Sequence, residues 1–151
     1  MMRLKKRECD DPSFFDEVFS KAQELFLALN SEDFPYLIPL NFSRSGSSIY
    51  VHCALEGRKL DLIRRDDRVS FSLIADVEID LPKATTYYKS VCGTGRAVIV
   101  EDPAEKGLAL DSIAERYNAL CPRPAPQRNI ERVGIIRIDI LSLTGKRALP
   151  K

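Results

Sequence analysis

Strand-like segments follow one another through short turns, and this arrangement constrains the fold more than any other feature of the sequence. Pro35–Phe42 and Ser48–Cys53, the second rich in Ile, Tyr and Val, are separated by the turn-forming residues of Ser43–Ser47. This pattern predicts a hairpin in which two antiparallel strands face each other. Four further segments also have the pattern of strands: Leu25–Leu29, Val69–Ala75, Tyr87–Glu101 and Gly134–Leu143.

Two of these segments carry additional information. Gly134–Leu143 alternates, with isoleucines at every second position and Arg137 and Asp139 between them, which indicates one buried and one polar face. Tyr87–Glu101 is long and holds Gly93 and Gly95 in its interior. Glycine inside a strand marks a bulge or a close approach of another backbone.

Three helices are expected between and beside the strands. Asp11 followed by Pro12 predicts a helix over Pro12–Ala22, and a short helix is predicted over Gly57–Arg65. A third helix should begin after Asp102 and end at the proline-rich Cys121–Pro126. About six strands and three helices with hairpin-like connections predict a mainly β fold, a small antiparallel barrel with peripheral helices.

Composition limits the classes of function. The 151 residues fit one domain spanning 1–151, and the net charge of +1 argues against nucleic acid as a partner. The apolar run Leu25–Leu29 is too short to span a membrane, and no apolar segment follows the basic start, so we expect a cytoplasmic protein. With one histidine and four widely spaced cysteines, no metal site is expected.

The most informative stretch for chemistry is the passage from a strand into the short helix. There Gly57 lets the backbone bend, and the cations Arg58 and Lys59 open the helix. Free amides and positive side chains at a helix start make an anion site, for which phosphate is the usual occupant. The alternative is a surface turn with two solvated cations.

The sequence resembles the pyridoxamine 5'-phosphate oxidase-related flavoproteins, and within them the nitroimidazole-resistance branch. The resemblance lies in segments that occur in the family's order over nearly the whole chain: Pro35–Phe42, Tyr50–Leu60, Tyr88–Ala97 and Leu143–Arg147. It implies a six-stranded antiparallel split β-barrel that binds FMN, and a homodimer with each flavin near the subunit interface.

The resemblance also assigns the cofactor-binding residues. Arg58 and Lys59 match the pair that grips the FMN phosphate, and His52 and Cys53 match the pair beside the cofactor. Ser90 matches the start of a strand that approaches the flavin from its far side. The strand whose backbone runs along the isoalloxazine ring is matched by Ile38, Pro39, Leu40 and Asn41.

The implied activity is that of an oxidoreductase that reduces small acceptors such as nitro compounds with electrons from a nicotinamide donor. Oxidation of vitamin B6 is not expected, because the tail Lys146–Lys151 lacks the substrate-binding histidine of the true oxidases. His52 is the candidate catalytic residue, although no carboxylate is placed by sequence to orient it, which favours a cofactor contact. The alternative is a non-catalytic storage or sensor protein that binds flavin or haem; the family also contains deazaflavin binders.

Overall fold

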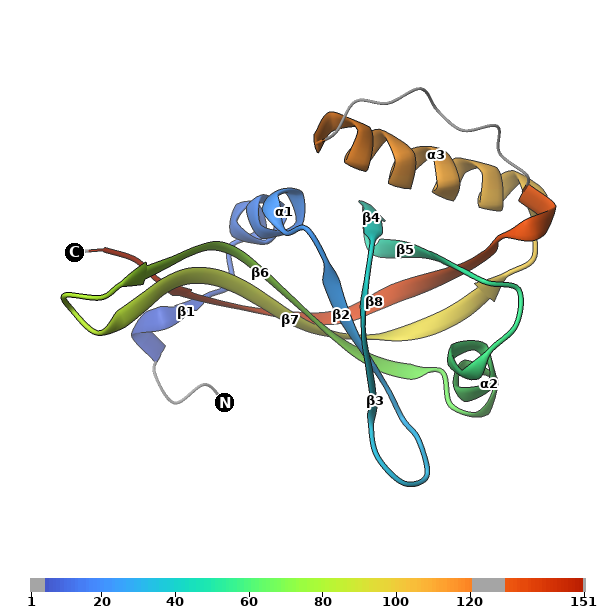
Figure 1. Cartoon of the computed structure of the whole chain (residues 1–151), viewed down its shortest axis with the longest axis horizontal. Coiled ribbons are helices and arrows are strands. Elements are labelled where there is room, and N and C mark those ends of the chain that lie inside the picture. The colour runs from blue at the N-terminus through green and yellow to red at the C-terminus, as the bar shows by residue number, and fades with distance from the viewer. Residues whose placement is uncertain (1–4, 121–129, 151) are drawn as a thin grey trace.

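An antiparallel sheet of eight strands forms the body of the computed structural model, which describes residues 5–120 and 130–150 (Figure 1). The strands are β1 (Glu8–Cys9), β2 (Leu25–Leu29), β3 (Tyr36–Leu40), β4 (Phe42–Ser45), β5 (Ser48–Cys53), β6 (Arg68–Asp80), β7 (Thr85–Val100) and β8 (Gly134–Ala148). Their order in the sheet is β3-β2-β6-β7-β8-β5-β4, and β1 also pairs with β8. Since β3 and β4 are separated only by Asn41, the two outermost strands are consecutive in the chain and the sheet curls into a barrel.

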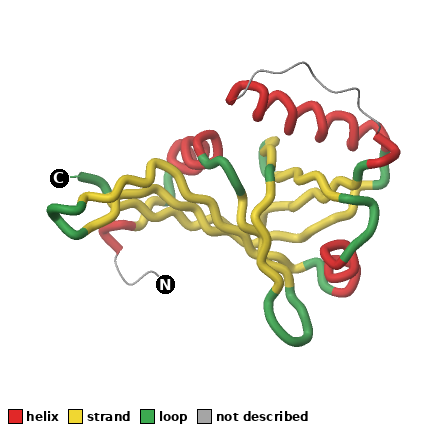
Figure 2. Tube along the Cα trace, in the orientation of Figure 1, coloured by secondary structure: helices red, strands yellow, loops and turns green. Residues whose placement is uncertain are grey.

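Three α-helices lie against this barrel: α1 (Pro12–Lys21), α2 (Arg58–Arg65) and α3 (Pro103–Leu120). Two short 3-10 helices, η1 (Lys5–Arg7) and η2 (Ile130–Arg132), precede β1 and β8. In the tube view α1 and α3 lie on one side of the strands and α2 lies at the opposite side (Figure 2). Among the described residues, no helix is long and apolar enough to cross a membrane.

The barrel core follows from the alternation of the strands. Leu25, Leu27 and Leu29 of β2 are buried, and Phe71 and Leu73 of β6 face the same interior. The helix α1 covers this core with its own apolar side chains, Phe14, Val18 and Phe19. A smaller cluster lies under α3 and consists of Val100, Ala109 and Ile135. Burial of these side chains, at about 25 cal/mol per Å² of apolar surface, is the main force that closes the barrel.

The expected mainly β architecture is confirmed, but the number of strands is eight rather than six. The segment predicted as one strand over Pro35–Phe42 is interrupted at Asn41, and β1 pairs through Glu8 opposite Lys146. The predicted proline-rich segment Cys121–Pro126 lies outside the described residues. The short helix begins one residue later than predicted, because Gly57 is its N-cap.

Two strands extend well beyond their predicted ends. β6 continues from Ala75 to Asp80 and β8 from Leu143 to Ala148, and with β7 they form an arm that projects away from the barrel (Figure 2). The register of β6 against β7 shifts between Ala75 and Glu78, where Asp76 has a φ of 52°. This bulge redirects β6 at the base of the arm.

Candidate functional site

The start of α2 offers backbone amides that no side chain caps. Gly57 is the N-cap, with φ 131° and ψ 170°, and it makes no side-chain cap hydrogen bond. Its carbonyl oxygen accepts hydrogen bonds from the amides of Leu60, at 2.9 Å, and Asp61, at 3.3 Å. The amides of the first turn are therefore donors of the kind that binds an anion at a helix start.

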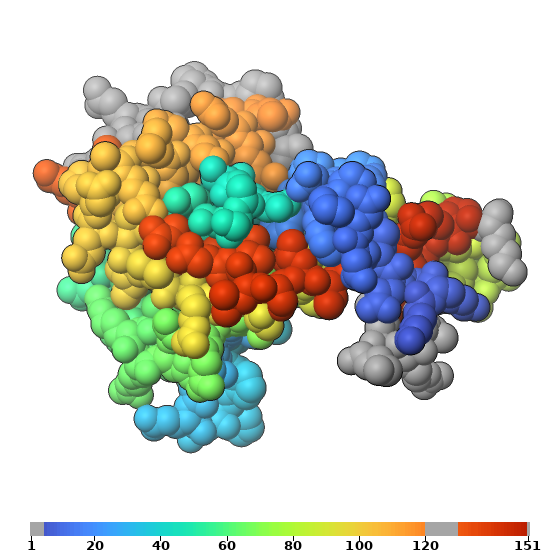
Figure 3. Space-filling view, turned by 180° about the vertical axis from the view of Figure 1, so that it is seen from behind, coloured from blue at the N-terminus to red at the C-terminus, as the bar shows by residue number. Residues whose placement is uncertain are grey.

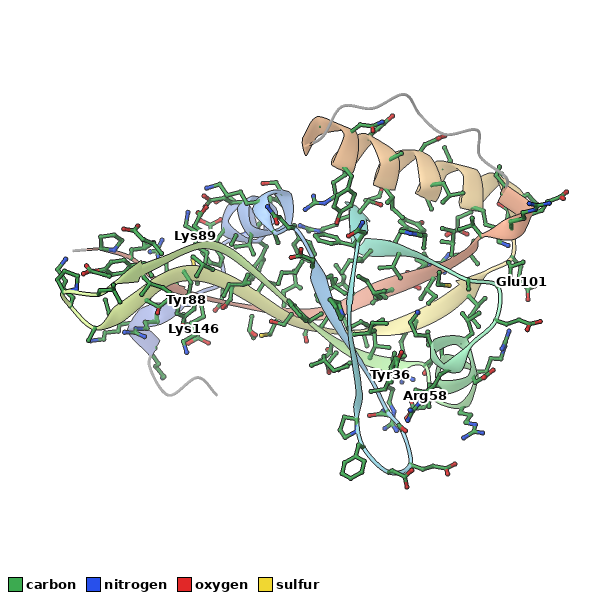
Figure 4. The ribbon with its side chains drawn as sticks, viewed as in Figure 1. Tyr36, Arg58, Tyr88, Lys89, Glu101 and Lys146 are labelled. Carbon is green, nitrogen blue, oxygen red and sulfur yellow. The ribbon has the colours of Figure 1, made fainter. Side chains whose placement is uncertain are left out.

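Two cations stand at this helix start in different surroundings. The Arg58 guanidinium is exposed, lies 5.2 Å from the centre of the Tyr36 ring and donates from Nη2 to Ser31 Oγ at 3.4 Å. Figure 4 shows Tyr36 and Arg58 side by side, although they come from β3 and α2. Lys59 is half-buried and acts electrostatically on Cys53. The pair thus adds positive charge to the uncapped start of α2.

The loop between β2 and β3 is fastened to α2 by polar contacts. Arg65 donates to Glu32 at 3.1 Å, and Asn30 donates to Asp66 at 2.9 Å. The hydrogen bonds from Arg68, with that of Asn30, hold the pKa of the Asp66 carboxyl well below its usual range. Between this loop and α2 lies a cavity of about 330 Å³, lined by Ser31, Glu32, Asp33, Arg58, Asp61, Leu62 and Arg65.

The two predicted residues at the end of β5 differ in burial. His52 is exposed, whereas Cys53 is half-buried and packs against the barrel core. Burial raises the pKa of the Cys53 thiol, and the nearby charges of Lys59 and Lys106 act in the opposite direction. A thiol with a raised pKa is protonated at neutral pH, so Cys53 is suited to packing beside a ligand rather than to nucleophilic attack.

The residues predicted to line a ring system, Ile38 to Asn41, lie where the sheet closes, in the end strand β3 and in the residue that separates it from β4. The side chains of Ile38 and Leu40 pack inward against the core, while Pro39 and Asn41 are exposed. Because β3 stands at one end of the strand order, its outer backbone groups are not used by a neighbouring strand. The segment can therefore offer its backbone to a ligand, as the family resemblance implies. Its exposed side chains within β3 are Leu37 and Pro39.

Ser90 is not brought to the other predicted residues within one chain. It lies in the arm, where its hydroxyl is 3.5 Å from the carbonyl oxygen of Lys146 in the paired strand β8. In Figure 4 its neighbours Lys89 and Lys146 lie at the opposite end of the molecule from Arg58. A ligand held at α2 could contact Ser90 only if that Ser90 came from a second copy of this chain.

The side chains that sequence reasoning missed are Tyr36 and Ser31. Tyr36 lies inside the segment Pro35–Phe42 that carries the family resemblance, so its position was available as a signal. Its contact with Arg58 was not, because it depends on how the loop after β2 folds back over α2. Ser31 is a turn residue with no distinguishing pattern.

A broad apolar groove of about 730 Å³ lies on the outer face of the sheet. Phe26, Leu37 and Ile74 contribute its exposed apolar surface, and small polar side chains of β7 and β8, among them Thr94 and Ser142, complete it. Ser90 and Lys146 belong to the same outer face further along these strands. The described residues contain no group of three or more His, Cys, Asp or Glu that could hold a metal ion.

These features agree with what comparison of the sequence shows. The family model for pyridoxamine 5'-phosphate oxidase matches residues 15–147, which is most of the chain. The chain therefore belongs to the pyridoxamine 5'-phosphate oxidase family, as the sequence resemblance indicated. No curated protein matches the sequence.

Solved structures with a similar fold support the same architecture. A candidate 5-nitroimidazole antibiotic resistance protein from Bacteroides thetaiotaomicron is 21% identical, with a TM-score of 0.80 over 93% of this chain and 86% of that chain. A flavocytochrome from Azotobacter vinelandii is 16% identical, with a TM-score of 0.80 over 99% and 73%. An FAD-binding protein from Mesorhizobium loti is 22% identical, with a TM-score of 0.70 over 95% and 98%. The expected split β-barrel is thereby confirmed.

Proposed function

We propose that this chain is an FMN-binding flavoprotein whose cofactor phosphate is held at the start of α2. The observation that carries the proposal is the uncapped helix start after Gly57, flanked by Arg58 and Lys59. Membership of the family supports it, and similar folds include a flavocytochrome and an FAD-binding protein.

The residues present fit such a cofactor. Amides, a guanidinium and an ammonium form a donor set suited to a phosphate dianion, and the Arg58 guanidinium is already positioned by Tyr36. The backbone of Ile38, Pro39, Leu40 and Asn41 and the end of β5 at His52 and Cys53 would hold the ring system. When bound, FMN supplies reversible hydride and electron transfer.

We propose further that the protein is an oxidoreductase that passes electrons from a reduced nicotinamide to a small acceptor such as a nitro compound. In this proposal His52 contacts the cofactor rather than acting as a general acid. Its exposure supports this role, and no carboxylate within the described ranges, 5–120 and 130–150, is hydrogen-bonded to it. Cys53 contributes packing, since its thiol is held in the protonated form.

The same proposal includes a homodimer. The groove on the outer sheet face exposes Phe26, Leu37 and Ile74, apolar side chains that a second copy would cover. Ser90 pairs with Ile74 on that face, and its neighbours Lys89 and Lys146 lie far from Arg58 of the same chain (Figure 4). Pairing through this face is the arrangement in which Ser90 of one copy would contribute to the cofactor site of the other.

The phosphate assignment is tested by comparing FMN with riboflavin, which lacks the phosphate. Replacement of Arg58 and Lys59 by Ala should weaken FMN binding at least about tenfold and leave riboflavin binding nearly unchanged, since hydrogen bonds between charged groups contribute about 1.5–3 kcal/mol. Flavin fluorescence titration measures both affinities. The matched control removes a charge from the other end of the helix with Arg64→Ala, at a residue outside the cavity beside Arg58, and should affect neither ligand. Equal losses for FMN and riboflavin would place the phosphate elsewhere.

The proposed activity is tested separately. An absorbance spectrum of the purified protein distinguishes bound flavin from deazaflavin and haem. Steady consumption of reduced nicotinamide in the presence of a nitro compound is expected if the protein is an oxidoreductase. Flavin or haem held without such turnover would indicate the alternative, a storage or sensor protein.

A further inference from the structure

A second cavity, of about 440 Å³, lies away from α2 on the side of the barrel that carries α1 and α3. Its lining comes from α1, from the hairpin of β4 and β5, and from α3, and consists of Asp16, Phe19, Ser20, Arg44, Gly46 and Arg116. Seen from behind, the β4–β5 hairpin lies between α1 and α3 (Figure 3). None of these residues belongs to the proposed flavin site.

Arg44 is held rigidly at one wall of this cavity. Its guanidinium lies 4.4 Å from the centre of the Phe19 ring, and Nε donates to the carbonyl oxygen of Gly46 at 2.9 Å. Nη1 donates to Asp16 at 2.7 Å. The side chain of Arg44 is 23% exposed and that of Asp16 70% exposed, so the carboxylate is the solvated member of the pair. A guanidinium carries five N–H groups, so Arg44 retains donors beyond these two bonds.

Arg116 lines the same cavity from α3 and has no carboxylate partner among the described residues. Its guanidinium lies 4.2 Å from the centre of the Phe42 ring, and Nη2 donates to the backbone carbonyl oxygen of Ala22. Its Nε is buried and has no hydrogen-bond partner in the part of the chain that the structure describes. A buried donor without a protein partner is rare in folded proteins, and such a group commonly bonds to a water or an ion.

The two guanidiniums are fixed relative to each other by the aromatic rings beneath them. Phe19 and Phe42 form an edge-to-face pair with centroids 6.1 Å apart, and each ring carries one arginine. Cation–π contacts of this kind help to hold planar guanidiniums in place. The described lining of the cavity therefore has two positioned guanidiniums, each with N–H groups left for a ligand, and one carboxylate, Asp16, which pairs with Arg44.

We propose that this cavity binds a small oxyanion, a carboxylate or phosphate group, between Arg44 and Arg116. Guanidinium forks recognise both groups through paired hydrogen bonds, and the partly buried setting strengthens the attraction relative to water. Asp16 competes with the ligand for Arg44.

A purely structural role for Arg116 would be to fasten α3 to the barrel. The neighbouring Tyr117 already does this, since its hydroxyl donates to the Gln23 carbonyl oxygen at 2.7 Å and accepts from the Phe42 amide at 3.1 Å. The fastening role also leaves unexplained why Arg44 is oriented into the same cavity from another element.

The test is a titration of the full chain with sodium phosphate and, separately, sodium acetate, followed by nuclear magnetic resonance. The backbone amide of Gly46 and the Nε–H groups of Arg44 and Arg116 report on this cavity and not on α2. Saturable shifts of these resonances are expected with at least one of the two anions, and the stronger response identifies the preferred group. Sodium chloride at equal ionic strength should give no saturation.

Two variants make the test decisive. Arg44→Gln should abolish the saturable shift, whereas Asp16→Asn should strengthen binding about two- to fivefold by removing the competing carboxylate, a surface ion pair of ordinary strength. Glu101→Gln, which removes an exposed carboxylate that lines neither cavity, should leave the affinity unchanged. The proposal is wrong if neither anion gives saturation, or if Asp16→Asn and Glu101→Gln behave alike. Loss of phosphate response at Arg58 alone would concern the flavin site and not this cavity.

Discussion

At the scale of single residues, the backbone conformation of Gly57 sets where α2 begins and therefore where Arg58 and Lys59 stand. Its φ of 131° with ψ of 170° belongs to a region that residues with a Cβ rarely enter. No atom would obstruct a Cβ there, so the requirement for glycine comes from backbone conformation alone. The sequence predicted that Gly57 lets the chain bend at this point, and its positive φ confirms the prediction.

Replacement of Gly57 by Ala should therefore lower the free energy of unfolding by about 1–3 kcal/mol, the usual cost of strained backbone. It should also weaken FMN binding, because the amides of the first turn would move. Urea denaturation and flavin titration measure the two effects.

Gly107→Ala is the matched control. Gly107 is inside α3, where a Cβ would make an ordinary 3.7 Å contact with Ile130. There alanine should raise the stability by up to about 1 kcal/mol, the difference in helix propensity. Equal destabilisation by both substitutions would contradict the assignment of strain to Gly57.

At the scale of elements, the sequence predicted those parts that depend on local patterns. The alternation of Gly134–Leu143, the cap at Asp11 and the turn before Ser48 were each sufficient to place an element. The break at Asn41 was not predictable, because the apolar pattern continues through it and the break results from closure of the barrel. The ends of β6 and β8 were missed because their polar residues are held in the sheet by pairing with β7, a tertiary effect.

The candidate site shows the same division. The pair Arg58–Lys59 and the segment Ile38–Asn41 were identified from motifs, and the structure places α2 near the start of β3 through Arg58 and Tyr36. The separation of Ser90 from this group could not be inferred from the order of motifs. It depends on the path of β7 across the whole molecule (Figure 1).

The arm is fastened to α1 by four alternating charges. Lys21 contacts Glu17 at 2.6 Å and Asp76 at 2.9 Å, and Lys89 contacts the same two carboxylates at the same distances. The hydrogen bonds from Lys21, and then those from Lys89, lower the pKa of both carboxyls. These groups link the bulge at Asp76 to the helix that covers the core.

This cluster predicts a dependence of stability on pH. A carboxyl whose pKa is lower in the folded state stabilises the fold above its ordinary pKa, and that contribution is lost as the pH falls through the lowered value. The melting temperature should therefore fall below about pH 4.5, and it should fall less steeply when Lys21 and Lys89 are both replaced by Met. Differential scanning calorimetry at several pH values measures the slope.

The control for this prediction is the double substitution of Lys5 and Lys6 by Met, which removes the same charge from the exposed η1. It should keep the slope of the unchanged protein. High salt should reduce the difference between the two double variants, because the charges of the cluster are partly exposed.

At the scale of the whole molecule, exposed apolar side chains gather around the groove on the outer sheet face. Leu37 is 64% exposed and Ile74 45% exposed beside a groove of about 730 Å³. Apolar surface gathered around one groove differs from single exposed side chains, which occur on any protein. A second copy on this face would also account for the position of Ser90.

If the dimer forms through this face, Ile74→Glu should convert it to a monomer, because the interface would have to bury a charge. Light scattering should give the mass of two chains for the unchanged protein and one chain of 17.1 kDa for the variant. Leu108→Glu, at a 72% exposed position on α3, should remain dimeric. A monomeric unchanged protein with flavin bound would contradict the proposed assembly.

The two ends of the strand order also bear on how copies of this chain behave at high concentration. The end strand β3 has five residues, one of them Pro39, and β4 at the other end has four. Short edges and an edge proline give an incoming strand few backbone groups with which to pair. Growth of a fibre by addition of strands edge to edge is thus disfavoured by the same seam at Asn41 that closes the barrel, and association is left to the faces of the sheet.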